Sequence, residues 1–170
     1  MRGKMILAAV IALCSANVLK QCALAQTDDH RCSNRLIQGT YGFTIEGQKL
    51  GGPGPTGPQV GVAITTFDGE GNLSQLDSVV IGGSQVSDFS HPPASGTYSV
   101  SANCTGTFTI EFQDGRPPVT VDFVVVDDGG EIDTVVLAPP GVVGPLATRS
   151  IGKRRFSSPR LSFQIAAPER

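Results

Sequence analysis

The chain contains no tryptophan and only two histidines, His30 and His91, among its 170 residues. The histidines stand far apart, and neither lies in a cluster with the spacing of metal ligands, which argues against a histidine-based metal site or catalytic centre. A 3.6-residue apolar repeat is also missing, so no amphipathic helix is predicted. After residue 25 no apolar run reaches the roughly 18 residues that a membrane-spanning helix needs. We therefore expect no metal, no cofactor and no transmembrane segment in the rest of the chain.

Basic residues are scarce in the middle of the chain and gather near its end. The last part contains Arg149, Lys153, Arg154, Arg155, Arg160 and Arg170. Without the first 25 residues, ten basic residues stand against fifteen acidic ones, a net charge of about −5. Nucleic acid requires a cationic face, so the acidic body argues against a nucleic-acid partner. Residues 151–170 lack sustained alternation and are predicted to form a basic, flexible C-terminal tail.

Residues 1–25 have the three parts of a secretory signal peptide. Arg2 and Lys4 precede the apolar run 5–13, and Ala23-Leu24-Ala25 forms a small-x-small cleavage signature. The alternative, a short membrane anchor, is disfavoured because the run is much shorter than a membrane span. We expect cleavage of this segment and export to the periplasm or the exterior. An N-terminal segment, 26–38, then precedes the folded domain.

Cysteine usage agrees with export. Cys14 and Cys22 leave with the signal peptide, so the mature chain keeps one pair, Cys32 and Cys104, in a compartment that permits disulfides. We predict that this pair is bonded, and a loop of that length contributes about 4 kcal/mol of stability in the chain-entropy model. Two buried thiols remain the alternative. Redox catalysis is disfavoured because neither cysteine belongs to a Cys-x-x-Cys motif.

From Gly39 onward the sequence consists of short β-type runs separated by turn residues. Tyr41, Phe43 and Ile45 alternate with small or polar residues, as in a strand with one buried face. Such runs cover 40–45, 60–67, 73–81, 96–101, 105–112, 119–126, 131–138 and 142–150. Their spacing predicts an all-β domain over 39–150, either a sandwich or a single antiparallel up-and-down eight-stranded β-barrel. The barrel is favoured because closure leaves no unpaired strand edge.

The segment 51–58 is rich in glycine and proline and is predicted to be a loop, because proline has no N–H to donate to a strand ladder. Within it, residues 52–57 match the Gly-x-Gly-x-x-Gly pattern of dinucleotide-binding loops letter for letter. No helix is predicted after the match, and the prolines remove N–H donors that a phosphate would need. The match therefore predicts no nucleotide cofactor.

Several segments resemble a known group of proteins. They are Gly39–Phe43, Phe67–Ser74, Ser95–Val100 and Cys104–Thr107. Together they are similar to small exported bacterial proteins of the allene oxide cyclase barrel-like group, within the calycin-like barrels, and the similarity runs from about Cys32 to Arg149. The resemblance implies a single eight-stranded antiparallel barrel and a disulfide between Cys32 and Cys104. No catalytic residue of the cyclases matches a position in this chain.

Aromatic side chains of the predicted strands are the candidates for the lumen of such a barrel. The candidate ligand-binding residues are Tyr41, Phe43, Tyr98, Phe108 and Phe123, with Asp122 as the one polar candidate. An eight-stranded barrel is just wide enough either to be filled by its side chains or to hold one small ligand. A filled core is therefore the alternative to a ligand site. Asp122 has the further alternative of facing solvent on the outside.

Two other patterns contain residue types that occur in catalytic and metal sites. Asp88, Ser90 and His91 are the types of a catalytic triad, but they lie within one local segment without the Gly-x-Ser-x-Gly context, so a polar surface loop is predicted. Carboxylates crowd two turns, around Asp68 and Asp127. Neither turn has the spacing of a calcium loop with its terminal glutamate, so both are interpreted as solvated turns without metal.

Three functions remain compatible with these residues. The first is non-catalytic binding of a small apolar ligand or a partner by an exported barrel, favoured by the aromatic strand faces and the lack of a catalytic cluster. The second is a cyclase or isomerase that acts on a hydrophobic substrate in the lumen, which rests on the resemblance, and no catalytic residue is assigned for it. The third is a structural or envelope-associated protein that uses the basic tail. No oligomeric state is predicted.

Overall fold

The computed structural model describes residues 32–137 and 145–155, which form nine strands and two short 3-10 helices. In chain order these are η1 (Asn34–Ile37), β1 (Gly39–Lys49), β2 (Gly57–Phe67), β3 (Asn72–Ile81), β4 (Ser84–Ser87), β5 (Ala94–Val100), β6 (Thr105–Glu111), β7 (Val119–Val126), η2 (Asp127–Gly129), β8 (Glu131–Leu137) and β9 (Leu146–Arg154). In this part of the chain no helix is long and apolar enough to cross a membrane.

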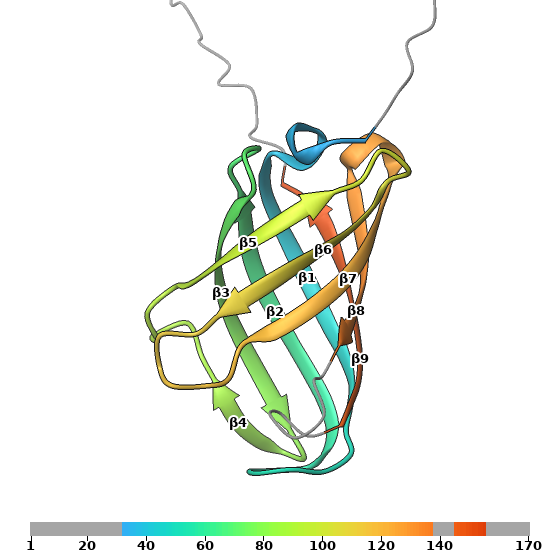
Figure 1. The fold of residues 1–170 in the computed structure, drawn as a ribbon. Coiled ribbons are helices and arrows are strands. Elements are labelled where there is room, and N and C mark those ends of the chain that lie inside the picture. The colour runs from blue at the N-terminus through green and yellow to red at the C-terminus, as the bar shows by residue number, and fades with distance from the viewer. Residues whose placement is uncertain (1–31, 138–144, 156–170) are drawn as a thin grey trace, which may run out of the picture. The chain divides into compact units, whose positions relative to one another are not determined.

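Eight of the strands close into a barrel (Figure 1). Neighbours in sequence pair antiparallel from β1 to β3 and from β5 to β9, β5 also pairs with β3, and β9 returns to pair with β1. The predicted antiparallel up-and-down barrel is therefore confirmed, and the sandwich is excluded. Closure leaves no open edge among these eight strands, which suits a small domain that must satisfy its backbone hydrogen bonds.

β4 is an addition to this ring that the sequence pattern did not predict. The first four residues of β3, Asn72–Gln75, pair with β5, whereas Val79–Ile81 at its other end pair with β4. The two Gly residues at 82 and 83 both have positive φ, which allows the tight turn between β3 and β4. With only four residues and no apolar alternation, β4 has no sequence signal of a strand.

Several strand ends differ from the expected boundaries, and β1 runs on to Lys49 where the pattern ended at residue 45. Pro58, assigned to a loop from the sequence, lies in β2 as its second residue, near the start of the strand, where a missing N–H is tolerated. Its carbonyl oxygen accepts from the Gly82 N–H at 2.9 Å. β9 extends to Arg154, so residues 151–154 of the expected tail belong to the barrel and pair with β1. Residues 142–144 of the predicted last strand and 156–170 of the tail lie outside the described residues.

Aromatic side chains fill one end of the barrel. Phe67, only 1% exposed, lies at the centre of this group. Its ring centroid is 5.6 Å from that of Tyr41, 4.9 Å from Tyr98 and 6.1 Å from Phe108, each in an edge-to-face arrangement. Ile37 of η1 is fully buried and covers the group. We call Tyr41, Phe67, Tyr98 and η1 the aromatic plug, and Phe108 lies between this plug and the rest of the lumen.

Arg154 joins the aromatic plug to the last strand. Its guanidinium donates hydrogen bonds to the carbonyl oxygens of Leu36, Gln38 (2.6 Å) and Gly129 (3.0 Å) and lies over the Tyr41 ring, 5.0 Å from its centroid. The Tyr41 hydroxyl also donates to the Gly129 carbonyl oxygen at 2.5 Å, and burial raises the pKa of Tyr41 to about 12. These bonds satisfy the backbone carbonyls that η1 and η2 leave without helical partners.

The predicted disulfide between Cys32 and Cys104 is confirmed. It links the segment before η1 to the turn between β5 and β6, with the two Cα atoms 4.9 Å apart. Asn34 reinforces this link, since its side-chain oxygen accepts from the Val100 N–H at 2.8 Å and its carbonyl oxygen accepts from the Tyr98 hydroxyl at 3.2 Å. The residues from Cys32 to Gln38 are thereby fixed at the same end of the barrel as the aromatic plug.

Candidate ligand-binding cavity

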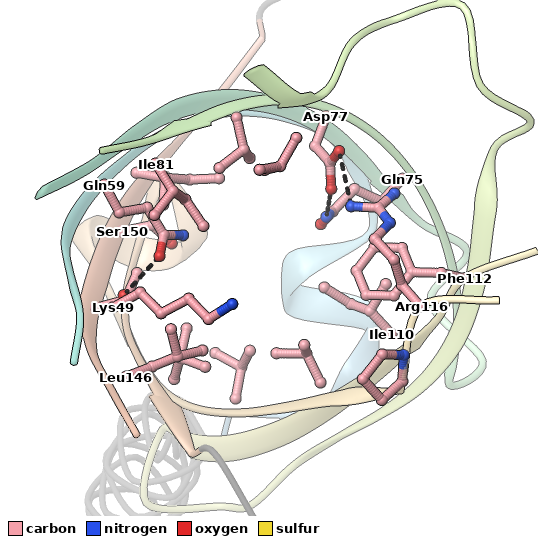
Figure 2. A pocket seen from close by; sticks show the side chains of 18 of the residues that line it. Lys49, Gln59, Gln75, Asp77, Ile81, Ile110, Phe112, Arg116, Leu146 and Ser150 are labelled. Atoms are coloured by element: carbon pink, nitrogen blue, oxygen red, sulfur yellow. Dashed lines mark hydrogen bonds and ion pairs between the residues drawn. The ribbon is translucent and has the colours of Figure 1, made fainter. Parts of the chain in front are cut away.

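The end of the barrel opposite the aromatic plug contains a cavity of about 390 Å³. Its wall comes from β1, β2, β3, β6, β7, β8 and β9, with Val86 of β4 and two loops at the rim. Most of the lining is apolar and includes Phe43, Ile45, Ile81, Phe108, Ile110 and Leu146. Figure 2 looks into this space, into which side chains converge from all around the barrel. A concave, mainly apolar site with a few polar groups is typical of small-molecule binding.

Small residues occupy several inward-facing positions of β1 and β2. Gly47 on β1 and Gly61 and Ala63 on β2 have the parity of the buried residues of their strands, yet they bring little or no side chain into the lumen. A larger residue at Gly152 on β9 would clash with Phe43, because an added Cβ would lie 2.3 Å from its ring. The Phe43 ring therefore packs closely against β9 at Gly152, where a larger residue would displace it.

A hydrogen-bonded polar group lies on the β3 wall of this cavity. Asp77 and Gln75 are 4% and 7% exposed. The Thr65 hydroxyl donates to Gln75 Oε1 at 2.9 Å, and Gln75 Nε2 donates to Asp77 Oδ2 at 3.4 Å. His91 Nε2 and Arg116 Nη1 reach Asp77 Oδ1 at 3.1 and 3.6 Å. Asp77 thus connects the loops before β5 and before β7 to β3. Figure 2 shows its contacts with Gln75 and Arg116.

Arg116 extends this polar group to the rim. Its Nε is 2.8 Å from Asp114 Oδ2, and its guanidinium lies over the Phe112 ring at 3.9 Å from the centroid. The Nη2 atom is buried and has no hydrogen-bond partner among the described residues. The carboxylates of Asp77 and Asp114 therefore balance the charge of Arg116, while its Nη2 group has no acceptor among the described residues.

The contact of His91 with Asp77 is expected to depend on pH. The pKa of His91 is raised, first by the hydrogen bond of its ring to the Pro92 carbonyl oxygen and then, against the lowering effect of burial, by its contacts with Asp77. Because the folded pKa is raised, the contact contributes fully below the ordinary histidine pKa, and its contribution is lost as the pH rises through the raised value.

An NMR titration of the His91 ring tests this contact. We expect a midpoint above about 6.5, the ordinary value for histidine, and a lower midpoint in the Asp77→Asn variant because the carboxylate charge is removed. Asp122→Asn is the matched control, since Asp122 lies on the outer face of the barrel, and it should leave the midpoint unchanged. A midpoint that Asp77→Asn does not move would contradict the contact.

Lys49 is the second charged residue of the cavity wall. It ends β1 with the parity of Tyr41 and Phe43, is 8% exposed, and extends toward the centre of the lumen (Figure 2). Its ammonium donates to the carbonyl oxygen of Pro53 in the loop before β2. A hydrogen bond of 3.3 Å from the Thr148 hydroxyl to Gln59 Oε1 lies on the same side of the cavity.

The structure divides the aromatic candidates into two groups. Phe43 and Phe108 line the cavity. Tyr41, Tyr98 and Phe123 belong to the same packed core but do not line the cavity. Tyr41 and Tyr98 lie in the aromatic plug, where the Tyr98 hydroxyl accepts from the Gly69 N–H at 2.8 Å. These three side chains stabilise the barrel and are not among the residues that line the cavity.

Asp122, the polar candidate, lies outside the lumen. Its neighbours Val121 and Phe123 are buried, so the alternation of β7 turns Asp122 outward, and it pairs with Thr107 and Val135, which are both exposed. The sequence left the two faces undecided because β7 is apolar on both sides, with Val124 exposed on the outer face. The carboxylate of the lumen is that of Asp77.

The remaining sequence patterns form local structure. Ser90 donates from its N–H and its hydroxyl to Asp88 Oδ1, at 2.8 and 2.5 Å, while His91 bonds to Asp77 instead. The carboxylate of Asp68 accepts three N–H bonds of its own turn, and its pKa is lowered to about 2, mainly by the Asn72 side chain. In the described ranges, no three His, Cys, Asp or Glu side chains gather as metal ligands would.

Sequence reasoning missed the polar residues of the cavity, although some carry a signal. Gln75 and Asp77 have the parity of Leu73 and Ile81 on β3, and Lys49 continues the inward series of β1. This parity predicts that they face inward. Arg116 lies in a loop without periodicity, so no pattern places it in the cavity.

The fold and the cavity define the class of this protein as an eight-stranded antiparallel β-barrel with one end filled and a mainly apolar cavity at the other. Comparison of the chain with protein-family models, curated proteins and solved structures finds no match.

Proposed function

We propose that this protein binds a small, mainly apolar ligand in the lumen of the barrel and does not transform it. The observation that supports the proposal is the cavity of about 390 Å³ with its aliphatic and aromatic wall. Transfer of an apolar molecule from water into such a wall is favourable by about 25 cal/mol for each Å² of apolar surface removed from water. The ligand therefore needs no covalent step to be retained.

The architecture supports a site that exists before the ligand arrives. Eight paired strands hold the wall, while the aromatic plug and the disulfide fix the far end. A preformed site binds more tightly because few groups lose freedom on binding. The same rigidity favours one ligand of matching size over larger ones.

The polar group at Asp77 favours binding over lumenal isomerase or cyclase chemistry. Both oxygens of Asp77 have partners, Oδ1 with His91 and Arg116 and Oδ2 with Gln75. With both oxygens engaged by groups of the protein, neither is free to contact a substrate proton. This arrangement suits a structural tie between two loops and β3 better than proton transfer.

We further propose that binding takes place outside the cytoplasm. The Cys32–Cys104 disulfide supports this location, because disulfides persist in oxidising compartments and are rare in the cytosol. The signal-peptide pattern of residues 1–25, which lie outside the described residues, points in the same direction.

A substitution that fills the lumen tests the binding proposal. Ile81 points into the cavity from β3 (Figure 2). The alternating burial of β3 turns its neighbour Val80 to the outside. We expect the uncharged fluorophore N-phenyl-1-naphthylamine to bind the wild type saturably and the Ile81→Trp variant at least about tenfold more weakly, a loss of roughly 1.4 kcal/mol. The indole occupies the space that the fluorophore needs.

Val80→Trp is the matched control, because it adds the same side chain to the outside, and its affinity should equal that of the wild type. Circular dichroism and thermal unfolding check that both variants keep the barrel. The proposal is wrong if the wild type does not bind the fluorophore saturably, or if a folded Ile81→Trp variant binds it as tightly as the wild type does.

A further inference from the structure

Lys49 places a positive charge inside an apolar space. Its side chain is more than nine-tenths buried and reaches the cavity that Phe43, Ile45 and Leu146 line. Burial of an ammonium is costly unless another charge or several hydrogen bonds compensate for the lost water. A charge at this position therefore requires a partner.

The described residues satisfy only part of the hydrogen-bonding capacity of the Lys49 ammonium. Its ammonium has three donors, and the structure gives it one acceptor, the Pro53 carbonyl oxygen. No carboxylate of the described residues forms an ion pair with it. Two lysine and arginine side chains on the outside do have such partners: Arg149 pairs with Glu46, and Lys153 pairs with Glu131 at 3.3 Å.

Asp77, the acidic residue of the cavity wall, is not an ion-pair partner of Lys49. Asp77 is the only acidic residue among those that line the described cavity, and its oxygens are bound by His91, Arg116 and Gln75. Lys49 and Asp77 stand apart in the lumen, with open space between their side chains (Figure 2). The positive charge of Lys49 thus faces the volume that a ligand would occupy.

We propose that the ligand has one anionic group, such as a carboxylate, that pairs with the Lys49 ammonium, and an apolar body that packs against Phe43 and Phe108. This inference rests on the proposed function, since it names the class of ligand that the lumen holds. The loop from Pro53 to Pro55 lies over Lys49 at the rim. The loop and the cavity wall shield an anion bound there from water. An ion pair in such surroundings is stronger than one on the surface.

A pair of nearly isosteric compounds that differ in charge tests the inference. The 1-naphthylacetate anion and the neutral 1-naphthylacetamide share the same aromatic body, and calorimetry measures the affinity of each. We expect the wild type to bind the anion at least about tenfold more tightly than the amide. In Lys49→Met this preference disappears through loss of affinity for the anion, while affinity for the amide is retained.

The matched control is Lys153→Met, which removes an exposed lysine of β9 and should keep the wild-type preference. The Lys49→Met variant is expected to fold at least as well as the wild type, because it replaces an unpaired buried charge with a side chain of similar length. Lys49→Arg keeps the charge and should keep a preference for the anion.

The outcomes separate this inference from the proposed function. If the wild type binds both compounds with equal affinity and Ile81→Trp weakens both, the proposal of an anionic group on the ligand is wrong. Binding in the lumen is then still supported. A preference for the anion that survives in Lys49→Met overturns the role of Lys49. If neither these compounds nor N-phenyl-1-naphthylamine binds, the proposed function fails, and this inference fails with it.

Discussion

Replacement of both Cys32 and Cys104 by serine is expected to lower the free energy of unfolding by about 4 kcal/mol. The two cysteines are 72 residues apart in sequence, so the bond closes a long loop and lowers the conformational entropy of the unfolded chain. In the folded protein the bond also holds η1 at its end of the barrel, beside the turn between β5 and β6. Urea unfolding of the purified variant and the wild type measures the difference.

Reduction provides the control for this experiment. Dithiothreitol should destabilise the wild type to nearly the level of the variant, whereas the variant, which has no bond to lose, should not respond. Ligand affinity in the absence of urea should change little, because the cavity lies at the opposite end of the barrel from the disulfide. If the wild type is insensitive to reduction, the bond does not form in solution.

Truncation of Phe67 to alanine is expected to cost about 4 kcal/mol, near the middle of the range for buried phenylalanine. Its ring is 1% exposed and contacts Tyr41, Tyr98 and Phe108. These neighbours come from β1, β5 and β6, and paired strands cannot move inward to close the space that the ring leaves. The cost therefore includes a cavity in addition to the lost transfer free energy.

Phe89→Ala is the matched control for this substitution. Phe89 is 51% exposed in the segment between β4 and β5, so its truncation should change stability by no more than about 0.5 kcal/mol. Urea unfolding compares the two variants with the wild type. A loss below about 1 kcal/mol for Phe67→Ala would show that the aromatic plug does not stabilise the barrel as its packing indicates.

Much of the fold is readable in the sequence because a β-strand has a period of two and turn residues punctuate it. Val119–Val126 is a strand with the predicted bounds, and the hairpin around Asp127 is where the turn residues place it. Closure into a barrel follows from the same pattern, since eight antiparallel strands need partners on both edges. The ends of strands are harder to predict, as Pro58 and Arg154 show, because they depend on which partner faces them.

Strand alternation predicted only part of the candidate site. Of the aromatic candidates, Phe43 and Phe108 line the cavity, but Tyr41 has the same parity as Phe43 and lies in the packed end. Parity tells which face of a strand a residue occupies and does not tell how far along the barrel axis the neighbours fill the space. Asp122 shows a second limit, because both faces of its strand are apolar.

The sequence by itself determined the β class and most of the strands, and it singled out Cys32 and Cys104 as the candidate disulfide, because each of these depends on local alternation, turn chemistry or a simple count. Only the tertiary structure decided that aromatic side chains fill one end of the barrel while a mainly apolar cavity remains at the other. It also decided that Lys49 faces this space without a carboxylate among the described residues. The reason is physical: the volume and charge of the lumen are sums over side chains from eight strands, and those sums exist only once the barrel has closed.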